Sequence, residues 1–214
     1  MRFIAPILLC VFLASCSSAT TSKPVGTGEY VNSVYTSKVS KDIQSGVYGA
    51  PNSKVNLTIF SDYQCPACIN LHEMIDTKLW KDYIDTKKIT VTFKNFPLTI
   101  PHANAEGDAL AGLCALSSGK FKEFRNEMYA VEEAKKGAAV TDDERAAAAK
   151  KAGITDPNFK QCVTEAWYQK RLEAEMKDGE RLGLQGTPSV YLGDTILNFT
   201  TPEEFFGIID AALK

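Results

Sequence analysis

The chain has 214 residues, of which 44% are hydrophobic, so it is long enough for one domain with a sizeable core. It carries 24 lysines and arginines against 26 aspartates and glutamates, a formal net charge of −2. No basic run is dense enough to indicate nucleic acid or anionic lipid as a partner, and we expect no nucleic-acid binding.

The first fifteen residues have the pattern of a secretory signal peptide. Arg2 precedes an apolar run over residues 3–13, which is too short for a membrane-spanning helix. The segment Leu13-Ala14-Ser15-Cys16 resembles the lipobox of bacterial lipoproteins, which implies cleavage before Cys16 and attachment of lipid to that cysteine. Ordinary cleavage, giving a soluble secreted protein, is the alternative. Either way we expect the protein to lie outside the cytoplasm, in a compartment where disulfides form and persist. With lipidation, it is anchored to a bacterial membrane and faces the periplasm or the cell surface.

Residues 16–42 are rich in Ser, Thr, Gly and Lys and show no sustained apolar periodicity. We predict a flexible tether here, and a folded domain over residues 43–214.

The domain begins with a strand and a helix that flank two cysteines. Residues 55–60 alternate apolar and polar side chains, which predicts a strand. Leu71, Ile75 and Leu79 recur every four residues and predict a helix from residue 66 to about 84, with Pro66 as its first residue. The segment Cys65-Pro66-Ala67-Cys68 lies at the junction.

The spacing of Cys65 and Cys68 predicts a reversible disulfide, because two intervening residues let both sulfurs meet across one helical turn. Cys65 falls at the helix cap, where free backbone amides and the helix dipole stabilise a thiolate, so we predict Cys65 as the nucleophile and the deeper Cys68 as the resolving thiol. A static disulfide or half of a zinc site are the alternatives. A zinc site needs a second ligand pair, which His72 and His102 do not supply, so we expect no metal and no cofactor.

The middle of the chain is helical and is bounded by strands. Residues 89–93 alternate as a second strand, and the pattern from about 103 to 178 is helical with several breaks. Within this stretch Thr141 and Glu144 form the pattern of a capping box.

The last part of the chain predicts a hairpin and a helix. Residues 190–192 and 195–199 are strand-like and flank Gly193-Asp194, a two-residue turn. Thr201 and Glu204 predict a capping box at the start of a final helix, with Pro202 at its first position. This helix presents four hydrophobic residues that we expect in the core: Phe205, Phe206, Ile209 and Leu213.

The order of strand, helix, strand, helical stretch, hairpin and helix predicts an α/β fold with a helical insertion. Together with Cys65-Pro66-Ala67-Cys68 and the later Gly186-Thr187-Pro188, it resembles the thioredoxin fold with a DsbA-type helical insertion, over about residues 43–214. The resemblance implies that Pro188 is a cis proline packed against the active-site cysteines. It also implies that the Thr187 backbone pairs with an extended substrate. A trans proline in an ordinary loop is the alternative reading.

One position departs from that family. Thioredoxin-like reductases usually carry a buried acid six residues before the first cysteine, and this chain has Ile59 there. Asp62 and Glu73 are the nearby acids, and we expect both to be solvated, which disfavours a reductase. His72 we also expect to be solvated, and His102 to be a helix-entry residue.

Cys114 and Cys162 lie in apolar segments of the helical stretch. Pairing Cys65 with Cys68 leaves these two together, and we interpret them as a structural disulfide, an arrangement that some DsbA-like proteins share. Two buried free thiols are the alternative.

The resemblance implies a thiol oxidase that introduces disulfides into reduced exported proteins through Cys65 and Cys68 and is reoxidised by a membrane quinone-linked partner. We expect it to act as a monomer, because residues 17–42 are too short and polar for a dimerisation domain. The alternatives are a disulfide isomerase or reductase of the same fold, or a lipid-tethered chaperone or binding module.

Overall fold

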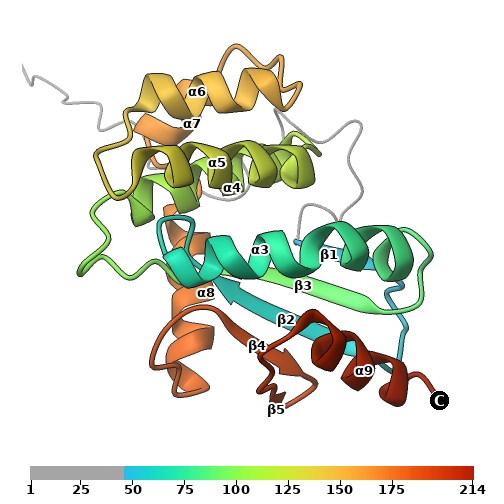
Figure 1. Cartoon of the computed structure of the whole chain (residues 1–214). Coiled ribbons are helices and arrows are strands. Elements are labelled where there is room, and N and C mark those ends of the chain that lie inside the picture. The colour runs from blue at the N-terminus through green and yellow to red at the C-terminus, as the bar shows by residue number, and fades with distance from the viewer. Residues whose placement is uncertain (1–45) are drawn as a thin grey trace, which may run out of the picture.

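The computed structural model describes residues 46–214 (Figure 1). The predicted signal peptide, tether and lipidated Cys16 lie outside these residues. Between residues 46 and 214, none of the helices combines the length and the apolar character needed to cross a membrane.

A five-stranded sheet forms the base of the domain. Its strands are β1 (Val47–Gly49), β2 (Asn56–Ser61), β3 (Thr90–Asn95), β4 (Ser189–Leu192) and β5 (Thr195–Ile196), in the order β1-β3-β2-β4-β5. Only the pairing of β2 with β3 is parallel, and the other neighbours run antiparallel. Strand β2 is central, and its Leu57 and Ile59 are fully buried, as the alternation of this segment predicts; Phe60, on the other face, is fully buried as well.

Helices from the first and last parts of the domain pack against the sheet. Helix α3 (Pro66–Lys78) continues into a π-helical segment η1 (Leu79–Ile84), and α9 (Pro202–Ala212) ends the chain. Leu71, Ile75 and Leu79 are all buried in a core cluster that also contains β2 and β3 residues. The predicted four-residue spacing therefore marks the face of the helix that covers the sheet.

The helical insertion lies between β3 and β4. It comprises α4 (Ala105–Ser117), α5 (Phe121–Lys135), α6 (Asp142–Lys151), α7 (Phe159–Thr164) and α8 (Gln169–Arg181). In Figure 1, α4 to α7 gather beside α3 on the side away from the sheet, and α8 leads back toward β4. A second hydrophobic cluster joins these helices to the start of α3, and it contains four cysteines: Cys65, Cys68, Cys114 and Cys162.

Both predicted capping boxes are present. The Thr141 hydroxyl accepts from the Glu144 amide, and the Glu144 carboxylate accepts in return from the Thr141 amide. Thr201 and Glu204 form the same reciprocal pair at the start of α9, with Pro202 in its first turn. Local sequence therefore fixes where α6 and α9 begin.

Three details differ from the sequence predictions. Strand β1 was not predicted, because its three residues carry too short a pattern. Strand β5 ends at Ile196 rather than at residue 199; the Leu197 amide still donates to the Val190 carbonyl of β4, and residues 197–200 line a groove. Leu213 lies at the C-cap of α9, where the helix has run past the core, and is 38% exposed rather than buried.

Candidate functional site

The two cysteines of the reactive pair lie at the N-terminus of α3. Cys65 is the N-cap, with extended backbone angles φ −71° and ψ 120°, and Pro66 follows in the first turn. Both thiols are free, and their residues are 6% and 1% exposed for Cys65 and Cys68, respectively. Cys65 therefore lies nearer to the surface than Cys68.

The loop before β4 covers the Cys65 sulfur. The Thr187–Pro188 peptide bond is cis, and the Cys65 thiol donates to the Thr187 carbonyl oxygen at 3.2 Å. The Thr187 hydroxyl is buried and has no hydrogen-bond partner among the oxygen and nitrogen atoms of the described residues. A buried hydroxyl of this kind is available to donate to the sulfur when Cys65 ionises.

The surroundings of Cys65 favour its thiolate. The Cys68 thiol contributes most, and the nearby Thr187 hydroxyl and the Cys68 and Ala67 amides add to its effect; together they lower the pKa of Cys65 to about 5. Burial acts in the opposite direction but is outweighed. Free amides at the first turn of a helix thus supply part of the stabilisation, as the position of Cys65 suggests.

Cys68 is in the opposite situation. Burial raises the pKa of the Cys68 thiol far above its usual value, and the neighbouring Cys65 raises it further. The backbone amide of Asp62 donates to the Cys68 sulfur at 3.5 Å. In the reduced pair the negative charge therefore lies on Cys65, and Cys68 keeps its proton.

The expectation that Asp62 is solvated is wrong. Asp62 is 2% exposed, and its carboxylate accepts hydrogen bonds from the Gln64 amide (2.9 Å), the Leu98 amide (2.9 Å) and His102 Nδ1 (2.7 Å). The chain from β3 to α4 folds over the turn that precedes Cys65, which buries the carboxylate and pairs it with His102. Glu73, by contrast, is exposed as predicted.

His72 is also not a freely solvated residue. Its ring stacks on Tyr129 with the ring centroids 4.6 Å apart, and its Nδ1 lies 2.7 Å from Asp76 Oδ2. Helix α5 of the insertion packs against this face of α3, a contact that the sequence of α3 alone does not reveal.

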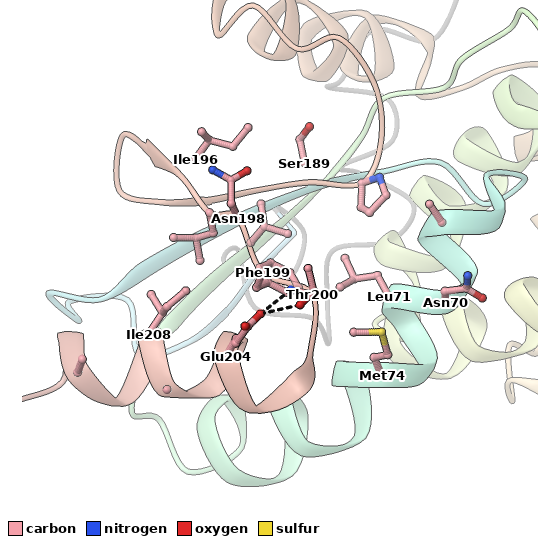
Figure 2. A pocket seen from close by; sticks show the side chains of 16 residues that line it. Asn70, Leu71, Met74, Ser189, Ile196, Asn198, Phe199, Thr200, Glu204 and Ile208 are labelled. Carbon is pink, nitrogen blue, oxygen red and sulfur yellow. Dashed lines mark hydrogen bonds between the residues drawn. The ribbon is translucent and has the colours of Figure 1, made fainter.

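Figure 2 shows a groove of about 1050 Å³ whose lining includes Ala67, the residue directly before Cys68. Ala67 and Met74 of α3 form one wall, and Pro188 and the hairpin form another. Glu204 at the start of α9 accepts hydrogen bonds from the Thr200 amide (2.7 Å) and hydroxyl (3.0 Å), which fixes the rim. Because the groove brings α3 together with the hairpin and α9 from the far end of the chain, no single motif predicts it.

Cys114 and Cys162 are bonded to each other. Their disulfide joins α4 to α7, with the Cα atoms 6.2 Å apart, and closes a sequence separation of 48 residues. Across residues 46–214, no group of three or more His, Cys, Asp or Glu side chains is arranged to hold a metal ion.

Comparisons with known proteins agree with this geometry. A family profile described as thioredoxin matches residues 41–211. Disulfide bond formation protein D of Bacillus subtilis is 24% identical over 175 residues, which make up 78% of this chain and 77% of that protein. Thiol:disulfide interchange protein DsbC of Dickeya dadantii is 28% identical over 167 residues, 77% of this chain but 54% of that protein.

The crystal structure of oxidised BdbD from Bacillus subtilis has the same fold, with a TM-score of 0.71 and 22% identity, covering 80% of this chain and 94% of that chain. The fold and the cysteine pair define the class of DsbA-like thiol:disulfide oxidoreductases. This chain belongs to the thioredoxin family. The predicted family and the predicted fold, a thioredoxin fold with a helical insertion, are confirmed.

Proposed function

We propose that this protein is a thiol oxidase that introduces disulfides into reduced exported proteins through Cys65 and Cys68. The observation that carries the proposal is the unequal environment of the two thiols. Groups around Cys65 lower its pKa to about 5, and burial keeps Cys68 protonated. Stabilising the Cys65 thiolate stabilises the reduced form of the enzyme, which makes its disulfide a stronger oxidant.

The proposed reaction starts from the oxidised enzyme. A substrate thiolate attacks the Cys65 sulfur, the Cys65–Cys68 bond breaks, and Cys68 departs as a thiolate that takes up a proton. A second substrate thiolate then attacks the substrate sulfur of the mixed disulfide and releases Cys65 as a thiolate. Two electrons pass from the substrate to the enzyme, and the substrate gains one disulfide.

Cys65 is the sulfur that the substrate attacks in this scheme, because it is the less buried of the two cysteines and lies next to the groove-lining residues Ala67 and Pro188. We assign the groove to an extended segment of the reduced substrate. Thr187, immediately before the cis proline, would pair its backbone with that segment. The apolar lining from Met74 and Ile196 suits an unfolded chain, which exposes hydrophobic side chains.

The cellular setting is part of the proposal. The signal-peptide pattern and Cys16 support an extracytoplasmic protein tethered by lipid to a bacterial membrane. There a membrane quinone-linked partner would accept the two electrons and restore the Cys65–Cys68 disulfide. We propose that the protein acts as a monomer.

Disulfide isomerisation is the second candidate. It is favoured by the 28% identity to the DsbC protein, although the match spans little more than half of that relative. No acid stands at Ile59, and the carboxylate of the buried Asp62 is bonded to the Gln64 and Leu98 amides and to His102. This favours the oxidase, because proton transfer from the resolving thiol matters most when the enzyme works as a reductant.

The test uses the chain from residue 16 onward with Cys16→Ser, so that lipid is not required. The oxidised protein is mixed with a reduced, unfolded model protein, and disulfide formation is followed by trapping free thiols. We expect stoichiometric oxidation that is abolished in Cys65→Ser and retained in the Cys114→Ala/Cys162→Ala control. The proposal would be contradicted if Cys65→Ser still oxidised the substrate. It would also be contradicted if the reduced protein rapidly repaired a scrambled substrate while the disulfide form oxidised nothing.

A further inference from the structure

The polar surroundings of Cys68 come from an unexpected part of the chain. Ile59, at the position of the usual buried acid, is fully buried and offers no polar group. The Cys68 sulfur instead accepts from the Asp62 amide at 3.5 Å, and the adjacent Ser61 side chain acts to lower the pKa of Cys68. Ser61 is the last residue of β2 and directly precedes Asp62, so the strand ends with a hydroxyl next to the amide that contacts the resolving cysteine.

The insertion completes this contact. The Ser61 hydroxyl lies 2.6 Å from the hydroxyl of Tyr129, a residue of α5 that stands 68 positions later in the sequence. Tyr129 is buried, and burial holds its pKa well above the usual value, so the phenol keeps its proton. The Tyr129 hydroxyl can therefore donate to Ser61, which leaves the Ser61 proton directed at the Cys68 sulfur.

A buried cation stands behind the two hydroxyls. The Arg125 guanidinium carbon lies 4.8 Å from the centre of the Tyr129 ring, and Arg125 is only 2% exposed. Its charge interacts with Cys68, and Asp76 at 3.4 Å balances it in part. His72, bonded to the same Asp76, stacks on Tyr129. Negative charge on Cys68 would thus face a cation and a chain of two hydroxyl donors.

These contacts matter at one step of the reaction. When a thiolate attacks Cys65, the departing Cys68 sulfur becomes negative inside the protein, where an unpaired charge is costly. Preorganised donors aimed at a developing charge stabilise the transition state without further rearrangement.

We propose that the helical insertion completes the active site. Ser61 is a catalytic residue that hydrogen-bonds the departing Cys68 thiolate, and Tyr129 is a positioning residue that acts through Ser61. This inference rests on the proposed thiol–disulfide exchange at Cys65 and Cys68, but not on the direction of electron flow.

The experiment measures two rates in the chain from residue 16 onward with Cys16→Ser. The first is reduction of the Cys65–Cys68 disulfide by glutathione, a step in which Cys68 departs. The second is alkylation of reduced Cys65 by iodoacetamide as a function of pH, which reports the Cys65 thiolate alone. Ser61→Ala removes one hydrogen bond to the departing Cys68 thiolate. Loss of such a bond, at the usual strength for a charged group, should slow reduction of the disulfide about 10- to 100-fold. We expect about a three- to tenfold loss in Tyr129→Phe, because the Ser61 hydroxyl remains.

The controls separate chemistry from packing. Ser61→Thr keeps the hydroxyl and should restore most of the rate. Tyr63→Phe removes a hydroxyl from the same hydrophobic cluster, where the Tyr63 ring centre lies 5.0 Å from that of Tyr129. Glutathione should reduce the disulfide of this variant at the parent rate. The pH profile of Cys65 alkylation should stay unchanged in all four variants, whereas a loosened fold would alter it.

Reduction rates of Ser61→Ala and Tyr129→Phe within about twofold of the parent would overturn the inference, and so would equal losses in Tyr129→Phe and Tyr63→Phe. If the parent disulfide itself fails to exchange with glutathione, the proposed function fails and the inference fails with it. Normal exchange by the parent with unaffected variants would refute the inference alone.

Discussion

The four cysteines of the domain share one hydrophobic cluster, yet the two pairs have different chemistry. Cys114 and Cys162 are bonded between α4 and α7, among residues such as Phe159 and Val163. Cys65 and Cys68 are free, and hydrogen-bond donors reach each sulfur. Since all four residues are at most 6% exposed, burial does not distinguish the pairs. The polar groups around each sulfur do distinguish them: they make one pair reactive, whereas the other pair is a structural disulfide.

The largest expected effect concerns the structural pair. Replacing both Cys114 and Cys162 with alanine removes a cross-link over 48 residues, which on the chain-entropy model lowers the free energy of unfolding by about 4 kcal/mol. Urea unfolding of the oxidised parent and the double variant measures the loss. The reduction potential of the Cys65–Cys68 pair should not change. A large shift in that potential would show that the two pairs are coupled, and the comparison would fail.

The next effect is a difference in how the stability of the reduced and oxidised forms depends on pH. In the folded, reduced protein the pKa of Cys65 is about 5, below the value near 9 expected when the chain unfolds. Between these values the unfolded state binds more protons, so the stability of the reduced form rises with pH. The oxidised form lacks this contribution. We expect the reduced form to gain stability relative to the oxidised form as the pH rises from 5 to 9, and the gain to vanish as the pH falls back to 5.

Thermal unfolding of both forms at pH 4.5 and pH 8 measures this difference. A gap that stays constant with pH would mean that the Cys65 thiolate is not stabilised by folding.

A smaller effect is expected at Thr187. Thr187→Val keeps the shape of the side chain but removes the hydroxyl that stabilises the Cys65 thiolate. Loss of one hydrogen bond to a charged group raises the pKa of Cys65 by about one unit. The pH dependence of Cys65 alkylation measures the shift. Thr187→Ser retains the hydroxyl and should behave like the parent; a Thr187→Val profile identical to both would exclude a role for this hydroxyl.

The smallest expected effect is on substrate binding. Ile196 is 49% exposed and lines the groove, whereas Ile100 is 91% exposed and does not. Truncating Ile196 to alanine removes apolar surface from the groove and should weaken binding of a reduced, unfolded substrate about three- to tenfold. The dependence of the oxidation rate on substrate concentration measures this. Ile100→Ala is the matched control, and equal weakening by both variants would argue against the groove as the binding surface.

Local sequence predicted the features that depend on neighbouring residues. The position of Cys65 at a helix cap, the first-turn prolines of α3 and α9, and both capping boxes follow from short motifs whose partners lie within four residues. Fold class followed from the order of such elements together with two motifs. These elements were predictable because the residues that stabilise them lie within about one helical turn of each other in the sequence.

Contacts between segments that are distant in the chain were not predicted from the sequence. Asp62 is buried because the segment containing Leu98 and His102 folds over it. The bond between Ser61 and Tyr129 joins β2 to the insertion across 68 residues. Polar residues that look solvated in sequence become buried when a distant element covers them, and here the covering elements lie between β3 and α5.

The reduction potential of the Cys65–Cys68 pair tests the central claim most directly. The protein without its lipid is equilibrated in glutathione buffers of known ratio, and the fraction of oxidised pair is measured after acid quenching and alkylation. The account predicts a value above about −160 mV, in the range of strong oxidants, because the thiolate of Cys65 stabilises the reduced form. A value below about −230 mV, close to that of thioredoxin, would contradict the oxidase proposal.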